Sequence, residues 1–385
     1  MKTLAKKLAT TTAAAALAAI TMIASPPEVK AADEKFAVSI ISVSVYGAWF
    51  IVKEKGLAKG VDVETKIIED TTARNAGLSS GAIQCVMTTM DNTVVTASAA
   101  VPVKHVAVPL MSYGLDQMIV SNDIKSEADL RGRTYAADYG FLNHMWMLLT
   151  LKRAGIPLKE ASHKIMLPQE STAAFASGQL DVDVTWIPFS TQSLERKDSH
   201  MLKSSRTDKT WERGLISDSI ACNKKWLEQK PEVAKEVVRA WFEAIDWWKK
   251  NPEEGNKIVA KGLDWPEADV RLTQNGAIML NINQNMGAVG LPGGNPVCKS
   301  LPEGIPKPPE SASGWGKLVG DKADCEAGYL ADTWKLFGDV YTEADVADSA
   351  ISPAEGIDNS IIKWLAAEGY DKKYGSNQWI GRLKP

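Results

Sequence analysis

The chain has 385 residues, of which 45% are hydrophobic and 24% are charged, and its formal net charge is −3. This composition excludes a disordered chain, and the balanced charge provides no basic surface for a nucleic-acid backbone. Because single domains commonly have about 100–150 residues, the length favours two packing units. The four histidines and four cysteines lack CxxC or HExxH spacing, so we expect no metal site and no cofactor.

The first 31 residues have the order of segments that is typical of a secretory signal peptide. Three lysines precede an apolar run over residues 13–24, and small residues up to Ala31 fit a cleavage site. The apolar run is shorter than the ~20 residues that a membrane-spanning helix needs. We therefore expect cleavage near Ala31 and a mature chain outside the cytoplasm, with an uncleaved anchor as the alternative.

The four cysteines are interpreted for an oxidising compartment. Cys298 and Cys325 flank a stretch that is rich in Gly and Pro, and closing a long loop restricts the unfolded chain, so we predict a disulfide between them. Cys85 lies in an apolar, strand-like run and is predicted to be a buried free thiol. Cys222 has no evident partner.

The hydrophobic pattern of the mature chain alternates between strands and helices. In the first part, the pattern predicts strands over 36–44, 61–68, 83–88, 103–110 and 117–121, and helices over 49–54 and 73–80. Strands and helices that alternate at this spacing are typical of an α/β fold whose parallel or mixed sheet is covered on both faces.

Farther along the chain the same alternation continues. The pattern predicts a strand over 134–137, a helix over 142–153, a strand over 215–221 and a long amphipathic helix over 231–250. Residues 287–314 are dense in Gly and Pro and are predicted to be irregular, and helical patterning returns from residue 329.

A weak internal repeat relates two distant segments, because residues 78–89 align without gaps on residues 175–186. Each copy has the pattern of a helix end, a glycine (Gly81 or Gly178), a short strand and a loop. The repeat therefore indicates two similar lobes. In open α/β sheets ligands bind beyond the carboxyl ends of the strands, so we expect the loops after the two copies to contact a ligand.

The loops at the predicted strand ends share aromatic, hydroxyl and acidic side chains, which suit a small amphipathic or cationic ligand. Arg74 is the one fixed positive charge in these segments. Asp91 and Asp138 have helix capping as an alternative role. Tyr46 and Trp49 have packing of the first helix on the sheet as an alternative role. The candidate ligand-binding residues are Ser44, Tyr46, Trp49, Thr89, Asp91, Asn92, Asp116, Asp138, Tyr139, Asn143 and Trp186.

No motif in the sequence predicts catalysis. A GxSxG elbow, a Walker-type glycine loop and a GxGxxG turn are all missing from the sequence, so we predict no catalytic residue. An anionic ligand would have to use backbone N–H groups at a helix start such as Asn143. Binding is therefore the simpler interpretation.

With these features together, the chain resembles the periplasmic solute-binding proteins of ABC importers in the nitrate, sulfonate and taurine group, which includes thiamine-pyrimidine binders. The motifs that carry the resemblance are KEKGL at 53–57, LSSG at 78–81, DLRGR at 129–133, GQLD at 178–181 with TWIP at 185–188, and the segment 231–252.

The resemblance implies a two-lobed periplasmic-binding-protein fold of type II. Each lobe is then a mixed sheet flanked by helices, and the ligand lies in the cleft between the lobes. Lobe I comprises 32–117 and 219–385, with a Gly/Pro-rich insertion at 287–325, and lobe II comprises 118–218. The resemblance also implies delivery of the ligand to a permease in the inner membrane, powered by a cytoplasmic ATPase.

Departures from the sulfonate binders decide the expected ligand. The loop at Asp138 is acidic where those proteins have a Ser/Thr-rich anion cradle. The segments 90–91 and 114–116 instead resemble a branch whose ligands are small nitrogen compounds, so we expect a small nitrogen-containing organic solute. We expect a monomeric, non-enzymatic protein with no nucleic-acid partner. The alternatives are a taurine, alkanesulfonate or nitrate-type anion, an enzyme resembling hydroxymethylpyrimidine synthase, and a structural or adhesive exported protein.

Overall fold

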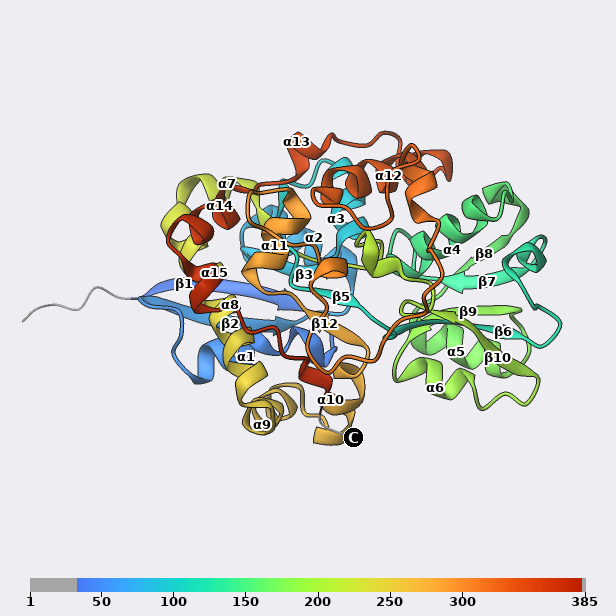
Figure 1. The fold of residues 1–385 in the computed structure, drawn as a ribbon, viewed down its shortest axis with the longest axis horizontal. Coiled ribbons are helices and arrows are strands. Elements are labelled where there is room, and N and C mark those ends of the chain that lie inside the picture. The colour runs from blue at the N-terminus through green and yellow to red at the C-terminus, as the bar shows by residue number, and fades with distance from the viewer. Residues whose placement is uncertain (1–32, 383–385) are drawn as a thin grey trace, which may run out of the picture. The chain divides into compact units, whose positions relative to one another are not determined.

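The computed structural model describes residues 33–382, so the predicted signal peptide lies outside the described residues. Two five-stranded mixed sheets flanked by helices organise this part of the chain (Figure 1). The α/β architecture that the sequence predicts is therefore confirmed. Within residues 33–382, no helix has both the length and the apolar character needed to cross a membrane.

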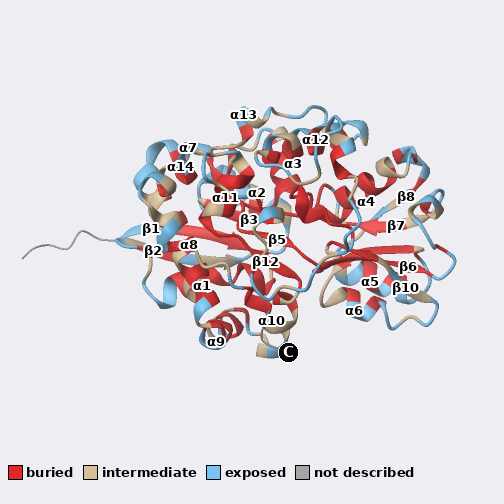
Figure 2. Ribbon diagram, in the orientation of Figure 1, coloured by how far each residue is buried: buried red, intermediate tan, exposed pale blue. Residues whose placement is uncertain are grey.

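The first sheet has the strand order β2-β1-β3-β11-β4. β1 pairs in parallel with β2 and β3, whereas β11 pairs antiparallel with β3 and β4. Every residue of β3 and β11 is buried, as expected for strands that are covered on both faces (Figure 2). The strands are β1 (Glu34–Ile40), β2 (Val61–Ile67), β3 (Cys85–Thr89), β4 (Val103–Ala107) and β11 (Asp218–Asn223).

The second sheet repeats this arrangement strand for strand, in the order β8-β7-β9-β6-β10. β7 pairs in parallel with β8 and β9, and β6 pairs antiparallel with β9 and β10. β6 and β11 therefore hold equivalent places in the two sheets. The strands are β6 (Asp116–Ser121), β7 (Thr134–Ala137), β8 (Ser162–Ile165), β9 (Val182–Trp186) and β10 (Ser199–Ser204).

The internal repeat corresponds to the central strand of each sheet and the helix before it. α2 (Thr71–Ser80) ends at Gly81 and leads to β3, and α5 (Pro168–Ala176) is followed by Gly178 and β9. Both glycines have left-handed backbone, with φ of 77° and 79°, which commonly ends a helix. α2 begins before the predicted start because the Asp70 carboxylate caps it by accepting a hydrogen bond from Ala73 N–H.

The predicted helix over 231–250 is confirmed as α8 (Pro231–Lys250), with Pro231 at its first position. Trp241 and Trp248 are fully buried on its inner face. A two-stranded sheet of β5 (Leu110–Ser112) and β12 (Ala277–Met279) joins the larger sheets. The remaining helices are α1 (Ala48–Glu54), α3 (Met90–Ser98), α4 (Leu142–Arg153), α6 (Phe189–Ser193), α7 (Lys224–Gln229), α9 (Pro252–Leu263), α10 (Glu267–Gln274), α11 (Ile282–Val289), α12 (Tyr329–Glu343), α13 (Pro353–Gly356), α14 (Ser360–Ala367) and α15 (Tyr370–Lys373).

Two disulfides are present. The predicted bond between Cys298 and Cys325 is confirmed. The prediction of a free thiol at Cys85 is wrong, because Cys85 is bonded to Cys222. β3 and β11 are antiparallel neighbours whose register places these two cysteines opposite each other, with their Cα atoms 4.0 Å apart. Since the two residues are 137 positions apart in sequence, only the strand pairing reveals this bond.

The residues between Cys298 and Cys325, here called the cysteine-bounded loop, lie against segments that adjoin the second sheet. Its Trp315 is fully buried and donates a hydrogen bond from Nε1 to the Asp208 carbonyl at 2.7 Å. The Arg153 guanidinium at the end of α4 lies 3.7 Å from the Trp315 ring centroid. The loop is thus held by one buried aromatic anchor as well as by its disulfide.

Candidate functional site

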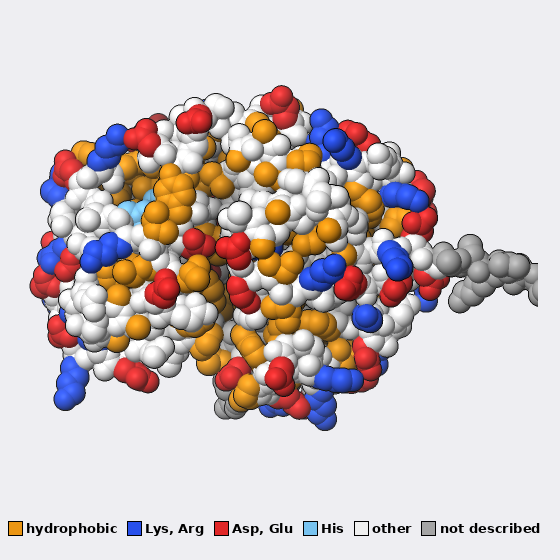
Figure 3. Space-filling model, turned by 180° about the vertical axis from the view of Figure 1, so that it is seen from behind, with side chains coloured by type: hydrophobic (Ala, Val, Ile, Leu, Met, Phe, Trp, Pro, Cys, Tyr) orange, Lys and Arg blue, Asp and Glu red, His pale blue; other side chains and the backbone are white. Residues whose placement is uncertain are grey.

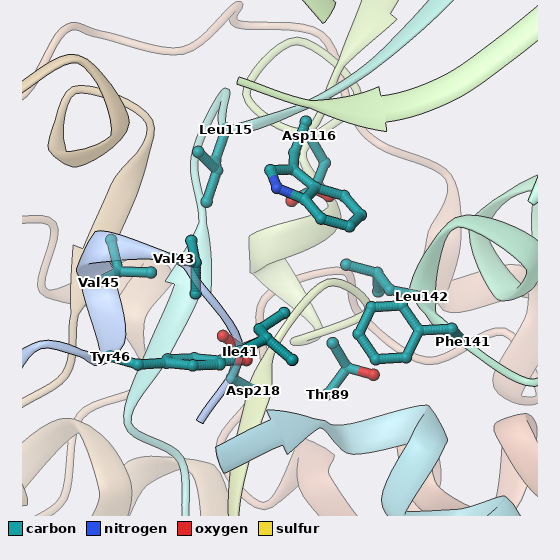
Figure 4. Close-up of a pocket in the computed structure, with 11 residues that line it drawn as sticks. Ile41, Val43, Val45, Tyr46, Thr89, Leu115, Asp116, Phe141, Leu142 and Asp218 are labelled. Atoms are coloured by element: carbon teal, nitrogen blue, oxygen red, sulfur yellow. The ribbon is translucent and has the colours of Figure 1, made fainter. Parts of the chain in front are cut away.

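A pocket, here called the inner pocket, lies where strand ends of both sheets come together (Figure 4). It encloses about 350 Å³ of empty space, part of it open to solvent. The lining residues are Ile41, Val43, Val45, Tyr46, Thr89, Leu115, Asp116, Phe141, Leu142, Trp186 and Asp218.

The equivalence of the two sheets extends into the inner pocket. Thr89 is the last residue of β3 and pairs with Asp218, the first residue of β11. Trp186 is the last residue of β9 and pairs with Asp116, the first residue of β6. Each repeat copy therefore ends at the pocket beside an aspartate that begins the neighbouring antiparallel strand.

Asp218 is paired with a tyrosine across the inner pocket. The Tyr46 hydroxyl, in a short 3-10 turn after β1, donates a hydrogen bond to the Asp218 carboxyl. Burial raises the pKa of Asp218 well above its ordinary value, and the neighbouring charges of Asp116 and Asp91 raise it further. Burial likewise raises the pKa of Tyr46.

Asp116 is the second carboxyl of the inner pocket and is 4% exposed. Its backbone N–H donates to Ser112 Oγ at 3.0 Å, and its carboxyl is hydrogen-bonded to the same hydroxyl. Burial raises the pKa of Asp116 to about 7, with a smaller contribution from the charge of Asp91. This carboxyl is therefore close to half-protonated near neutral pH.

Asp91 lies in the first turn of α3, two residues after the pocket-lining Thr89, and is fully buried. It accepts a hydrogen bond from the Tyr341 hydroxyl of α12 at 2.6 Å. Burial raises the pKa of Asp91 to about 6, although hydrogen bonds from Tyr341 and Thr89 oppose the shift.

A second, wider pocket, here called the outer pocket, shares Ile41, Phe141 and Trp186 with the inner one. Arg74 lies in it, donating to the Met87 carbonyl at 3.3 Å and to Thr71 Oγ1 at 2.9 Å. The other residues that line it are Ser42, Glu69, Asp138, Leu167, Pro168, Gln169, Phe189 and Trp265. Figure 3 shows one face of the molecule with a hollow near its middle, along which acidic and hydrophobic side chains gather.

The structure brings five of the predicted site residues to the two pockets. Tyr46, Thr89, Asp116 and Trp186 line the inner pocket, and Asp138 lines the outer pocket. Neither Asp91 nor Asp138 is the N-cap residue of the helix that follows it, because the N-cap residues of α3 and α4 are Thr89 and Phe141.

Two predicted residues near the first strand lie outside both pockets. Trp49 is fully buried in the core, with its ring 5.5 Å from Phe36 and 5.1 Å from Trp241. Ser44 is also buried, and its hydroxyl contacts Thr273 of α10. Both side chains point toward the helices that cover the first sheet, so they have packing roles here.

Three further predicted residues support the surrounding backbone. Asn92 donates to the Gly140 carbonyl at 3.0 Å, and Asn143 donates to the Val184 carbonyl. Tyr139 is 46% exposed and donates to the Asp345 carbonyl at 3.0 Å. Asn92 thereby holds the loop before α4, and Asn143 ties α4 to β9.

Local sequence pattern does not predict Asp218 or the apolar residues of the inner pocket as site residues. Asp218 lies within the predicted strand over 215–221, and nothing local marks it as different from a strand residue. The signal was available in the repeat, because Asp116 and Asp218 begin equivalent strands. A predicted antiparallel strand beside each copy would have placed both aspartates at the inner pocket.

Comparison with known proteins gives matches over much of the chain. The family model described as NMT1/THI5 like matches residues 48–255. A protein of Brucella abortus (strain 2308) described as a binding protein is 27% identical over 222 residues, which are 57% of this chain and 68% of that protein.

Two solved structures illustrate the similarity in fold. The periplasmic aliphatic sulphonate binding protein SsuA from Escherichia coli superposes with a TM-score of 0.62 at 16% identity, over 85% of this chain and 92% of SsuA. The periplasmic nitrate-binding protein NrtA from Synechocystis has a TM-score of 0.51 at 17% identity, over 63% of this chain and 70% of NrtA. The fold is thus the periplasmic-binding-protein fold.

Proposed function

Because the chain belongs to the NMT1/THI5-like family, we propose that it captures a small nitrogen-containing organic solute for an ABC importer. Its relatives in sequence are binding proteins, and the chain is a binding protein and not an enzyme.

The observation that carries the proposal is the chemistry of the inner-pocket wall. Two carboxyls, from Asp116 and Asp218, face a space whose other walls are largely aromatic and aliphatic, and no Lys, Arg or His is among the lining residues. Carboxyl oxygens accept hydrogen bonds from N–H groups, and the faces of Tyr46 and Trp186 suit a cation or a flat apolar group. A small anion would find no cationic side chain among the residues that line this pocket.

We propose that residues 32–117 with 219–385 form one lobe and 118–218 the other, and that the lobes close on the ligand. The two aspartates that meet the ligand begin β6 and β11, the strands by which the chain passes from one sheet to the other. Ligand contacts at these positions would therefore favour the closed arrangement. Delivery to an inner-membrane permease, a monomeric state and a periplasmic location complete the proposal.

A thermal-shift panel tests the ligand class, because a compound that binds only the folded chain raises its stability, by about 2.7 kcal/mol at 100 times Kd. The panel contains primary amines, quaternary ammonium ions, guanidinium compounds and pyrimidines, together with taurine, alkanesulfonates and nitrate. We expect the melting temperature to rise with compounds of the first group only. A rise with sulfonates or nitrate alone would establish the anion alternative instead.

A further inference from the structure

Two buried carboxyls line the inner pocket, and a third, Asp91, lies two residues after the lining residue Thr89. Asp91, Asp116 and Asp218 are 0%, 4% and 7% exposed and belong to α3, β6 and β11. Asp116 and Asp218 line the pocket itself, and the charges of all three act on one another. Within residues 33–382, none of the three forms an ion pair with a Lys, Arg or His.

The groups that face these carboxyls are hydroxyls rather than cations. Tyr46 donates to Asp218, Tyr341 donates to Asp91, and Ser112 is hydrogen-bonded to Asp116. Thr89 adds a hydroxyl beside Asp91. Arg74, on α2, acts electrostatically on Tyr46, but its other charged neighbours are Glu69, Asp70 and Asp138.

Three buried carboxylates whose charges act on one another cannot all be ionised without a positive charge among them. They therefore share protons as one titrating unit, whose protons belong to the group rather than to a single residue. We propose that the inner pocket takes an organic monocation in exchange for a proton held by Asp91, Asp116 and Asp218. This inference rests on the proposed function and assigns its ligand class.

The protonation behaviour of the three carboxyls agrees with the exchange. Burial raises the pKa of Asp91 to about 6 and that of Asp116 to about 7, and it raises the pKa of Asp218 well above its ordinary value. A bound cation favours the ionised carboxyl and lowers these values, so a proton leaves as the cation enters. Affinity for a cation should therefore increase as the pH rises through this range.

The first experiment needs no ligand. The full mature chain is labelled with ¹³C at the aspartate carboxyl carbons and titrated by NMR, and Asp91→Asn, Asp116→Asn and Asp218→Asn assign the signals. We expect at least one of the three carboxyls to titrate above pH 6. If all three titrate below pH 5, the proton exchange is excluded, whereas amine-dependent thermal shifts would still support the proposed function.

The second experiment uses tetramethylammonium chloride, whose charge is fixed and which therefore cannot itself release a proton. Calorimetric titration at pH 7 in phosphate and in Tris buffer reports the protons released, because the two buffers have different heats of ionisation. We expect about one proton released per bound ion and affinity that increases about tenfold per pH unit between pH 5 and 7.

Matched variants distinguish the loss of a pocket carboxyl from the loss of one negative charge elsewhere on the protein. Asp116→Asn and Asp218→Asn should each weaken tetramethylammonium binding at least tenfold and reduce the proton release. Asp339→Asn removes one carboxylate from the exposed face of α12 and should change neither quantity. Absence of tetramethylammonium binding at every pH, or binding without proton release, would overturn the inference. An increase in melting temperature with neutral nitrogen compounds would still support the proposed function.

Discussion

Trp186 and Trp49 are indole side chains of the same size, but only Trp186 faces a pocket. Trp186 belongs to both the inner and the outer pocket, and its ring lies 5.6 Å from Phe189 and 6.4 Å from Phe141. Trp49 is enclosed by Phe36 and Trp241. One indole is therefore available to a ligand, whereas the other fills the core.

We expect Trp186→Ala to weaken binding of the best compound of the thermal-shift panel at least tenfold, because a large aromatic anchor is lost. Trp49→Ala should leave a cavity and lower the free energy of unfolding by about 3–5 kcal/mol without changing Kd. Calorimetry measures Kd, and urea titration measures the free energy of unfolding. Equal Kd values for Trp186→Ala and the unchanged chain would remove Trp186 from the site.

At the scale of elements, a glycine in α9 allows this helix to pack closely against α8. Gly255 in α9 lies against the Trp248 ring of α8, where an added Cβ would overlap with the ring atoms. Trp248 is fully buried and donates from Nε1 to Asn256 Oδ1 at 2.9 Å, so the ring has little freedom to move. The close contact of the two helices therefore depends on the missing side chain.

Gly255→Ala tests this contact against helix propensity. Propensity alone would stabilise α9 by about 1 kcal/mol, whereas overpacking against Trp248 commonly costs about 1–3 kcal/mol. We expect a net loss of stability in urea titration. Lys257→Ala, at an exposed position of the same helix, is the control and should change stability little. A stabilised Gly255→Ala variant would contradict the packing argument.

The local hydrophobic pattern was sufficient to predict helices and strands, but not which of them contact one another. The bounds of α8 and the strands that end at Thr89 and Trp186 follow from hydrophobic spacing and from the repeat. The bond between Cys85 and Cys222 depends on the register of two strands far apart in sequence, which no local pattern contains. Similarly, Ser44 turns toward Thr273 because α10 packs there, a contact that loop composition does not reveal.

At the scale of the whole molecule, segments after residue 297 contact helices that accompany the first sheet and helices that accompany the second sheet. α12 packs on α3 and α4, and Tyr341 from α12 reaches both Asp91 and the Phe141 carbonyl. The cysteine-bounded loop adds contacts through Trp315 and Arg153. These contacts hold the end of the chain against elements on both sides of the inner pocket.

The disulfide of the cysteine-bounded loop should contribute measurably to stability. Closing a loop of 27 residues corresponds to about 3–4 kcal/mol in the chain-entropy description. We therefore expect Cys298→Ser with Cys325→Ser to lower the free energy of unfolding by about this amount, as measured by urea titration. Kd should stay the same, because neither cysteine lines the pockets; a weaker Kd would show that the loop also shapes the site.

The connectivity of the two disulfides has a consequence for how the chain matures. Four cysteines allow three pairings, and the observed one joins the first cysteine to the second and the third to the fourth: Cys85 to Cys222, and Cys298 to Cys325. If the chain is exported as proposed, an oxidant that joins cysteines in the order in which they leave a translocation channel, N-terminus first, would produce this pairing directly. Correct bonds would then form without thiol–disulfide exchange, and a slow reshuffling step would be unnecessary.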